Sequence, residues 1–319
     1  MSIVELNIQA MLFDFIGGLG IFLLGIKYMG DGLQRTAGDR LRNILDRFTS
    51  NPVMGVIAGI VVTILIQSSS GTTVLTVGLV NAGFMTLRQA IGVIMGANIG
   101  TTITAFIIGF DLGEYSLPII GVGAFMLFFF KNPKITNIGL TIFGFGALFF
   151  GLDLMSAGVK PLSTLQAFSD LTLSMSEYPI LGVIVGTVFT MIVQSSSATI
   201  GILQSLMLEG AIELKAALPV LFGDNLGTGA TITARRAALT HVIFNLIGTI
   251  IILILLTPFT FLVSQIQEWL GLNPAMTIAF AHGIFNFSNT LIQLPFIAVL
   301  AMIVTKLVPG EDTVIQYKP

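Results

Sequence analysis

The polar block Gln-Ser-Ser-Ser occurs twice in this chain, at residues 67–70 and 194–197, each time in the middle of an apolar stretch. Shifting the sequence by 127 residues aligns residues 52–104 with 179–231 without a gap, and 22 of the 53 aligned positions are identical. An apolar bias can match valine with valine by chance, but it does not align two polar blocks. The chain is therefore an internal duplication, which a further match at a shift of 126 residues extends back toward Leu12 and Leu140.

The composition places both copies in a membrane. Of 319 residues, 54% are hydrophobic and 9% are charged, and several apolar runs approach the roughly 20 residues that cross a bilayer core. The absence of cysteine excludes disulfides, thiolate metal sites and cysteine nucleophiles, and a net charge of -2 gives no indication of nucleic-acid binding. The first ten residues lack the basic segment and cleavage pattern of a secretory signal, so no leader is expected. The sequence predicts an all-α polytopic membrane protein.

Each polar block divides an apolar stretch into two segments that are too short to cross a membrane alone. Residues 51–66 and 71–86 would each measure about 24 Å as a helix, whereas a hydrocarbon core measures about 30 Å. Two half-helices that meet at a polar break, at equivalent places in two halves, are typical of a transporter substrate site. We therefore predict re-entrant helical hairpins at 51–86 and 178–212. The alternative is one long tilted helix over 52–85 with buried hydroxyl groups.

The distribution of Lys and Arg predicts the orientation of the two copies. Spans are expected at about 12–33, 89–109, 115–130, 136–158, 216–234, 237–259 and 277–305. One side of the membrane then carries Arg35, Arg40, Arg42, Arg47, Arg88, Lys131, Lys134, Arg235, Arg236, Lys306 and Lys318. Only Lys160 and Lys215 lie on the other side, so the crowded side is expected to be cytoplasmic.

Three spans separate the two Gln-Ser blocks. The first block should therefore enter from the cytoplasmic side and the second from the external side, which makes the repeats inverted. The predicted organisation in the plasma or inner membrane is one transmembrane repeat at 1–135 and a second at 136–319, the latter including a C-terminal span.

A second polar block follows each hairpin. Residues 96–102 read GANIGTT, residues 223–228 read GDNLGT, and Thr104 and Thr231 are identical one turn further on. Paired Gly, Asn and Thr residues predict an unwound transmembrane helix in each repeat, with more hydrogen-bond donors and acceptors. The alternative is that small residues spaced four apart indicate only close helix packing, with the hydroxyls bonded to their own helix.

The polar breaks suit both an anion and a small cation. The second half-helix begins with unpaired N–H groups and a positive dipole end, beside the hydroxyls of Ser69, Ser70 and Thr72. The first half-helix ends there with free carbonyls, which together with the Gln67 amide oxygen offer a hard-oxygen site for a monovalent cation. Unsatisfied polar groups at the midplane cost several kcal/mol each, so we favour binding over a packing role.

Ionisable residues inside the spans indicate further roles. Lys27 and Asp153 occupy equivalent positions with opposite charge, so we expect them to neutralise each other at the repeat interface, with ion coupling as the alternative. Asp224 stands where the first repeat has Ala97. We expect its carboxylate to strengthen a cation site, with a helix N-cap as the alternative.

The motif H-x-I-F-N occurs twice, as His241 with Asn245 and as His282 with Asn286. A spacing of four places each pair on one helix face. Two histidines without a nearby carboxylate or cysteine make a poor metal site, so we predict interhelical hydrogen bonds for both pairs.

The doubled Gln-Ser-Ser-Ser block, the G-x-N-x-G-T blocks and H-x-I-F-N resemble the type II sodium/phosphate cotransporter family, in its short prokaryotic form without a PhoU-like domain. The resemblance covers nearly the whole chain. It implies sodium-driven transport of inorganic phosphate by alternating access, with sodium ions as co-substrate, no other cofactor, and a homodimer by family likeness.

Together, the polar blocks and the resemblance give two sets of candidate residues. The phosphate-binding candidates are Gln67, Ser68, Ser69, Ser70, Asn98, Ser195, Ser196, Ser197 and Asn225. The sodium-binding candidates are Gln67, Ser68, Thr101, Thr104, Gln194, Ser195, Ser196, Asp224, Thr228 and Thr231.

These features predict a secondary active, sodium-coupled phosphate symporter. The alternatives are a carrier for another oxyanion or a carboxylate, and a phosphate-sensing membrane protein that does not transport. An enzyme is not expected, because no serine has a histidine and an acid in a triad arrangement and no phosphate-loop signature occurs. The sequence leaves open the ion stoichiometry, the protonation state of phosphate, the direction of transport, and sodium against proton coupling.

Overall fold

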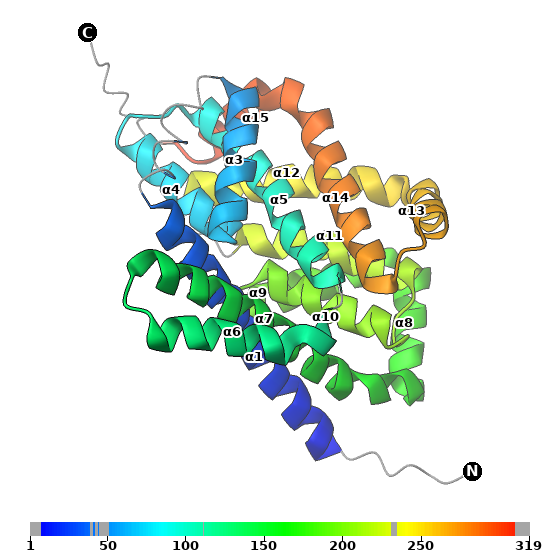
Figure 1. Cartoon of the computed structure of the whole chain (residues 1–319). Helices are drawn as coiled ribbons and strands as arrows, with labels where there is room; N and C mark the ends of the chain where they lie inside the picture. Colours follow the sequence, from blue (N-terminus) through cyan, green and yellow to red (C-terminus); the bar gives the residue numbers. More distant parts are fainter. Residues whose placement is uncertain are drawn as a thin grey trace.

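The computed structural model describes residues 8–38, 41, 44, 51–110, 112–230 and 235–309. These residues form α-helices and short 3-10 helices, with no strand among them (Figure 1). The helices of the first half are α1 (Ile8–Ala37), α3 (Pro52–Ile66), α4 (Ser69–Asn81), α5 (Leu87–Gly109), η1 (Gly113–Tyr115) and α6 (Ser116–Phe129). Those that follow are α7 (Pro133–Val159), η2 (Lys160–Thr164), α8 (Gln166–Glu177), α9 (Pro179–Val193), α10 (Ser196–Leu208), α11 (Leu214–Ala230), α12 (Arg235–Ile254), α13 (Leu256–Leu270), α14 (Pro274–Gln293), η3 (Leu294–Phe296) and α15 (Ile297–Leu307).

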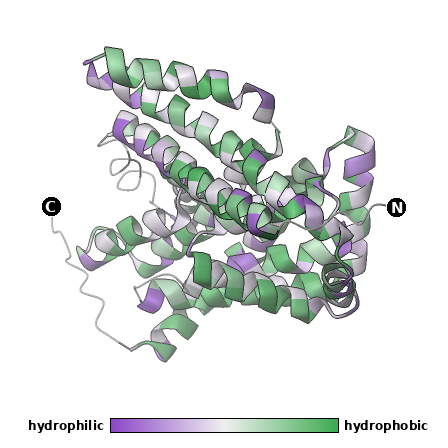
Figure 2. Cartoon of the chain, turned by 90° about the horizontal axis from the view of Figure 1, so that it is seen from below, coloured by the Kyte–Doolittle hydropathy of each residue, from purple (hydrophilic) through white to green (hydrophobic). Residues whose placement is uncertain are grey.

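Most of these helices are apolar along their length, including those on the outside of the molecule (Figure 2). Five segments are long and apolar enough to cross a membrane, namely Ile8–Ala37, Leu87–Gly109, Pro133–Thr164, Arg235–Ile254 and Pro274–Leu307. A sixth results if α8 and α9, which are bent by 114° at their junction, count as one span. The prediction of an all-helical, multi-pass membrane protein is confirmed.

Helices occupy all the predicted spans within the described residues, but two of the spans are interrupted. The span predicted at 237–259 ends with α12, and a new helix starts with Pro258 in its first turn. The span predicted at 277–305 changes from α-helix to 3-10 helix at η3, which contains Pro295, and then continues as α15. Proline has no N–H to donate and its ring clashes with the preceding turn, so the α-helical hydrogen bonding is interrupted at both places. The separate helices α8 and α13 were not predicted.

Helices α1 and α7 pack along a seam of glycines spaced seven residues apart: Gly18, Gly25 and Gly32 on α1 and Gly144, Gly151 and Gly158 on α7. A methyl group on any of them would overlap backbone atoms of the other helix. Gly18 lies against Gly151, whereas Gly32 lies against Asn137, so the two helices are antiparallel. These helices hold equivalent positions in the two repeats.

Glycines also bring α3 against α5 and α9 against α11. A methyl group on Gly96 would overlap the backbone of Val56, and one on Gly223 would overlap the backbone of Val183. Helix α5 runs without interruption from Leu87 to Gly109, and α11 is helical throughout 223–228. The predicted unwinding at 96–102 and 223–228 is therefore wrong. The small residues there allow close helix packing, which was the alternative interpretation.

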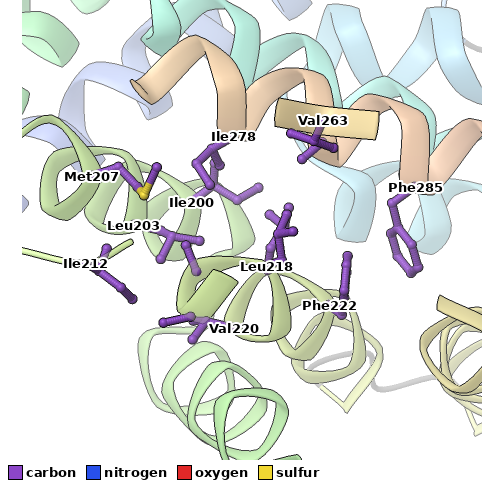
Figure 3. Packing of buried hydrophobic residues seen from close by; sticks show 14 of the residues in the cluster. Ile200, Leu203, Met207, Ile212, Leu218, Val220, Phe222, Val263, Ile278 and Phe285 are labelled. Carbon is purple, nitrogen blue, oxygen red and sulfur yellow. The ribbon is translucent and has the colours of Figure 1, made fainter. Parts of the chain in front are cut away.

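An apolar core surrounds α10 and α11 (Figure 3). Ile200 and Leu203 of α10 pack with Leu218 of α11 and Ile278 of α14 in one buried cluster. Because lipid tails are as apolar as these side chains, close van der Waals packing rather than exclusion from water stabilises such a core. The core fixes the position of the second Gln-Ser block, which immediately precedes α10.

Candidate functional site

Both Gln-Ser-Ser-Ser blocks form the same break between two helices, one between α3 and α4 and the other between α9 and α10. Gln67 and Gln194 adopt the left-handed conformation, with φ of 58° and 59°, and they are the only described non-glycine residues with positive φ. The backbone N–H of each glutamine donates to the carbonyl of Thr63 or Thr190, at 2.7 and 2.8 Å. This conformation costs a non-glycine residue roughly 1–2 kcal/mol, so the surrounding contacts must impose it.

A serine caps the second helix of each break. The Oγ atom of Ser68 accepts a hydrogen bond from the N–H of Gly71 at 3.0 Å, and that of Ser195 accepts from the N–H of Ala198 at 3.3 Å. Each serine is extended, with φ of -151° and -149°, as a helix N-cap requires. The N-cap therefore fixes the point at which α4 and α10 begin, directly after the break.

A threonine pair holds the two helices of each break together. The Oγ1 atoms of Thr63 and Thr72 are 2.8 Å apart, and those of Thr190 and Thr199 are also 2.8 Å apart. Residues nine apart in one straight helix are separated by about 13.5 Å along the axis, so the chain folds back at each break. The alternative of one continuous helix over 52–85 is therefore wrong.

The two breaks meet at one cavity of about 100 Å³. A single buried water needs only about 10–15 Å³, so the cavity accommodates a small polyatomic ion or several waters. Its lining is made of hydroxyl and amide side chains from both repeats: Gln67, Ser68, Ser69, Ser70, Thr101, Thr190, Gln194, Ser195, Ser196, Ser197 and Thr228. No charged side chain is among these residues.

The cavity brings together most of the predicted site residues. All four residues of each Gln-Ser-Ser-Ser block line it, as do the predicted sodium candidates Thr101 and Thr228. The predicted residues outside its lining are Asn98, Thr104, Asp224 and Asn225. Thr231 lies outside the described residues.

Thr190, which lines the cavity, and its counterpart Thr63 were not among the predicted site residues. Each threonine lies four residues before the glutamine of its block, and the two align at the shift of 127 residues. A polar residue that is identical in both copies of an otherwise apolar half-helix was the signal that could have identified them.

Thr104 acts behind the cavity rather than in its wall. Its Oγ1 donates to Oε1 of Gln67 at 2.9 Å, while Nε2 of Gln67 donates to the carbonyl of Ile64 at 2.6 Å. Nε2 of Gln194 makes the equivalent hydrogen bond to the carbonyl of Met191. Each glutamine side chain therefore folds back onto the helix that precedes it, and Thr104 fixes the orientation of Gln67.

Asp224 is completely buried in the interior of α11. Its Oδ1 atom accepts a hydrogen bond from Oγ1 of Thr190 at 2.8 Å. The predicted alternative of a helix N-cap is wrong, because Asp224 is well past the first turn of α11. The carboxyl group instead contacts Thr190, and Thr190 lines the cavity.

The H-x-I-F-N motifs form a buried network beside the cavity. Nδ2 of Asn98 donates to Oδ1 of Asn245 at 2.8 Å, and Nδ2 of Asn225 donates to Oδ1 of Asn286 at 2.7 Å. Nε2 of His282 lies 3.3 Å from Oδ1 of Asn225. The prediction of interhelical hydrogen bonds is confirmed for these residues. It is wrong for His241, whose ring nitrogens have no hydrogen-bond partner among the described residues.

Lys27 and Asp153 do not neutralise each other, so that prediction is wrong. Among the described residues, Lys27 forms no ion pair. The antiparallel packing of α1 and α7 explains the separation. Near Lys27, α1 contacts residues 144 and 148 of α7, whereas near Asp153, α7 contacts residues 18 and 22 of α1.

Comparison with known proteins supports the duplication. The model of the Na+/Pi-cotransporter family matches residues 21–157 and again residues 158–278, and each match contains one Gln-Ser-Ser-Ser block. No solved structure matches the chain.

Relatives of three kinds match the sequence. The uncharacterized protein YqeW of Bacillus subtilis is 30% identical over 309 residues, which cover 94% of this chain and 99% of YqeW. The protein of Escherichia coli (strain K12) named "Putative inorganic phosphate export protein YjbB" is 29% identical over 94% of this chain, which spans only 56% of that relative. The sodium-dependent phosphate transport protein 2B of Homo sapiens is 37% identical over 95 residues, covering 29% of this chain and 14% of the human protein.

Proposed function

The chain belongs to the Na+/Pi-cotransporter family, and we propose that it is a sodium-coupled symporter of inorganic phosphate working by alternating access. The observation that carries the proposal is the meeting of both Gln-Ser-Ser-Ser blocks at one cavity. A binding role for either block alone would not require this meeting. The cavity joins the two repeats, which is where transporters built from inverted repeats bind their substrate.

The cavity is suited to hold phosphate without a cationic side chain. The N-termini of α4 and α10 meet there, and each contributes backbone N–H groups and the positive end of a helix dipole. Ser69, Ser70, Ser196 and Ser197 add hydroxyl donors in the first turns of these helices. We assign these groups to phosphate, with Gln67, Ser68 and Ser195 at the rim of the same site.

We assign to sodium ions the positive charge that the side chains lining the cavity lack. Gln67, Ser68 and Thr101 in one repeat correspond to Gln194, Ser195 and Thr228 in the other at the shift of 127 residues, and all six line the cavity. Side-chain amide and hydroxyl oxygens are hard ligands that suit a monovalent cation. A phosphate anion taken out of water needs such compensating charge, so each ion should bind well only when the other is present.

Three of the predicted residues are assigned supporting roles. Thr104 orients Gln67, and Thr231 is the equivalent residue in the second repeat. Asp224 is assigned to the sodium site indirectly, because the Thr190 hydroxyl donates to it. That hydroxyl oxygen is then left as an acceptor toward Thr199 and the cavity. Asn98 and Asn225 are assigned to the buried network and not to phosphate.

We extend the proposal to the membrane topology. The antiparallel packing of α1 on α7 and the doubled break support two inverted repeats, residues 1–135 and 136–319, with hairpins that re-enter on opposite faces. The excess of Lys and Arg supports a cytoplasmic location for the face that the first hairpin enters. Exchange of the two repeats between open and closed arrangements would expose the cavity to each side in turn.

Uptake of radiolabelled phosphate into liposomes containing the purified protein tests the proposal. We expect uptake to require an inward sodium gradient, and to fall at least tenfold when potassium replaces sodium. Excess unlabelled sulfate or dicarboxylate should not compete, because competition would indicate a carrier for another anion. Phosphate binding without flux would indicate a sensor, and uptake driven equally well by a proton gradient would exclude sodium coupling.

A further inference from the structure

A second and larger cavity of about 580 Å³ lies between α1 and the first hairpin. One of its walls carries Lys27, Asp31 and Gln34 of α1, and the other carries Gln67 and Ser68 at the break. We refer to this cavity as the α1 groove. It combines an apolar surface with a lysine, a carboxylate and two amides, a composition that lipid does not favour.

The α1 groove leads to the Gln-Ser cavity. Gln67, Ser68 and Ser195 line both spaces. Ser195 belongs to the second break, so the groove extends past the first hairpin to the point where the two repeats meet. The groove and the polar cavity are therefore adjacent and share these side chains in their walls.

Charge distinguishes the groove from the cavity at its end. Among the described residues, Lys27 is the only cationic side chain that lines the groove, and none lines the Gln-Ser cavity. Its side chain is exposed, and it forms no ion pair within the part of the chain that the structure describes, although Asp31 follows one turn later. An unpaired lysine inside a membrane span is costly in lipid, which favours a groove that contains water.

The equivalent space in the second repeat is closed. Leu75, which lines the groove, is 42% exposed, whereas its counterpart Ile202 is 8% exposed and packs in a cluster with Leu152 of α7. A methyl group on Gly201 would overlap the ring of Phe22, so α1 fills the position that would correspond to a second groove. At the second hairpin this part of the break is covered, although Gln194 itself is exposed.

We propose that the α1 groove is the aqueous route by which phosphate reaches the Gln-Ser cavity in this conformation, and that Lys27 concentrates the anion in it. This inference rests on the proposed function, because it assumes an anionic substrate. Asp31 opposes Lys27 and limits how tightly the anion is held along the route. The groove is on the face that the distribution of Lys and Arg predicts to be cytoplasmic, since Arg35 is in the last turn of α1.

Initial rates of sodium-driven phosphate uptake into liposomes in which the cytoplasmic face of the protein points outward test the role of charge in Lys27→Gln, Lys27→Arg and Asp31→Asn. At low ionic strength, with sodium held constant and choline chloride as the added salt, K27Q should raise KM for phosphate on the order of threefold to tenfold and leave kcat within about twofold. K27R should retain the wild-type KM, and D31N should lower it. At high ionic strength the differences should disappear, because salt screens the attraction.

A matched control and a second measurement separate steering from structural damage. Lys160→Gln removes an exposed lysine that lies 3.6 Å from Glu209 outside the groove, and it should leave KM unchanged at every ionic strength. An unchanged KM in K27Q, or a shift that salt does not reduce, overturns the role of Lys27. Loss of uptake in K27R as well would show that the position is structural, which also overturns it.

Labelling tests the route without any transport measurement. Since the chain has no cysteine, Leu75→Cys and its repeat counterpart Ile202→Cys introduce single reactive groups. A membrane-impermeant maleimide should label L75C at least tenfold faster than I202C, and sodium with phosphate should slow the labelling of L75C. Equal labelling of both variants overturns the route. If the wild type shows no sodium-dependent uptake but L75C is labelled as expected, the proposed function fails while the groove remains.

Discussion

The two hairpins share one local design but differ in their surroundings. In both, a left-handed glutamine, a capping serine and a threonine pair form the break, with nearly equal angles and distances. Helix α4 of the first hairpin packs mainly on α3 and α5, whereas α10 of the second packs on α5, α7, α9, α11 and α14. Helix α4 is therefore at the edge of the helix assembly, and α10 is enclosed by it, whereas α9 keeps an exposed face.

Under the proposed function, the two repeats therefore share the residues assigned to binding and differ in access. The residues that form the break are duplicated, so both repeats offer the same donors to the cavity. Access depends on the residues around the break, which have diverged. Gln204 illustrates this, because its Nε2 donates to the carbonyls of Ala105 at 2.9 Å and Ala275 at 2.8 Å, whereas the first repeat has Val77 at this position.

The two hairpins should differ most in their threonine pairs. Thr190→Val removes the hydrogen bond to Thr199 and also leaves the buried carboxyl group of Asp224 without that donor. We expect it to lower the free energy of unfolding by about 3 kcal/mol, against about 1 kcal/mol for the matched Thr63→Val. Denaturant unfolding in detergent micelles measures both values. Equal losses would show that Asp224 does not distinguish the two breaks.

The attachment of the second hairpin is tested at Gln204. Gln204→Leu removes two interhelical hydrogen bonds and should lower the free energy of unfolding by about 2 kcal/mol. The matched control is Val77→Leu in the first hairpin, which has no such bonds to lose and should change stability by less than about 0.5 kcal/mol. Equal stability of the two variants would show that Gln204 does not anchor the second hairpin.

The cation site is expected to be stronger in the second repeat. Asp224→Asn keeps the shape of the side chain and replaces the carboxyl group behind Thr190 with an amide that cannot ionise. It should raise the sodium concentration for half-maximal uptake about tenfold, equivalent to about 1.4 kcal/mol. The KM for phosphate at saturating sodium serves as the internal control and should change less than twofold. If the variant and the wild type have the same sodium dependence, Asp224 does not contribute to the sodium site.

The capping serines should differ least between the hairpins. Ser68→Ala and Ser195→Ala should each lower the free energy of unfolding by about 1 kcal/mol, because each loses one N-cap hydrogen bond. Thermal unfolding of both variants under the same conditions measures the difference between them. A difference larger than about 1 kcal/mol would show that the surroundings affect even the local break.

The position of each break could be predicted from the sequence, because the reasons for it are local. A polar block that interrupts an apolar run at the same place in two repeats is difficult to accommodate in a continuous helix facing lipid. Five of the seven spans were also predictable from their apolar length, whereas the described residues within 115–130 and 216–234 form no helix long and apolar enough to cross a membrane. The enclosed position of α10 was not predictable, because it depends on side chains such as Gln204 and Phe22 that make contacts far from the block.

Two of the wrong predictions have different physical causes. A glycine such as Gly96 can either unwind its helix or allow another helix to pack closely against it. Which of the two occurs depends on whether a backbone such as that of Val56 lies opposite. A packing partner cannot be read from one segment alone. The opposite charges of Lys27 and Asp153 suggested a pair, but antiparallel packing moves equivalent positions apart. The separation of Lys27 and Asp153, by contrast, follows from the inverted orientation that the distribution of Lys and Arg predicts.

The glycine seam between α1 and α7 also bears on biosynthesis. Helix α7 is completed about 120 residues after α1, so at ~5–20 residues per second the ribosome needs roughly 6–24 s to supply it. During this interval the small-residue face of α1 has no matching surface, and Lys27 beside it must be tolerated by lipid or by the insertion machinery. The early membrane intermediate is therefore expected to be the stage at which this protein depends most on assistance from the cell.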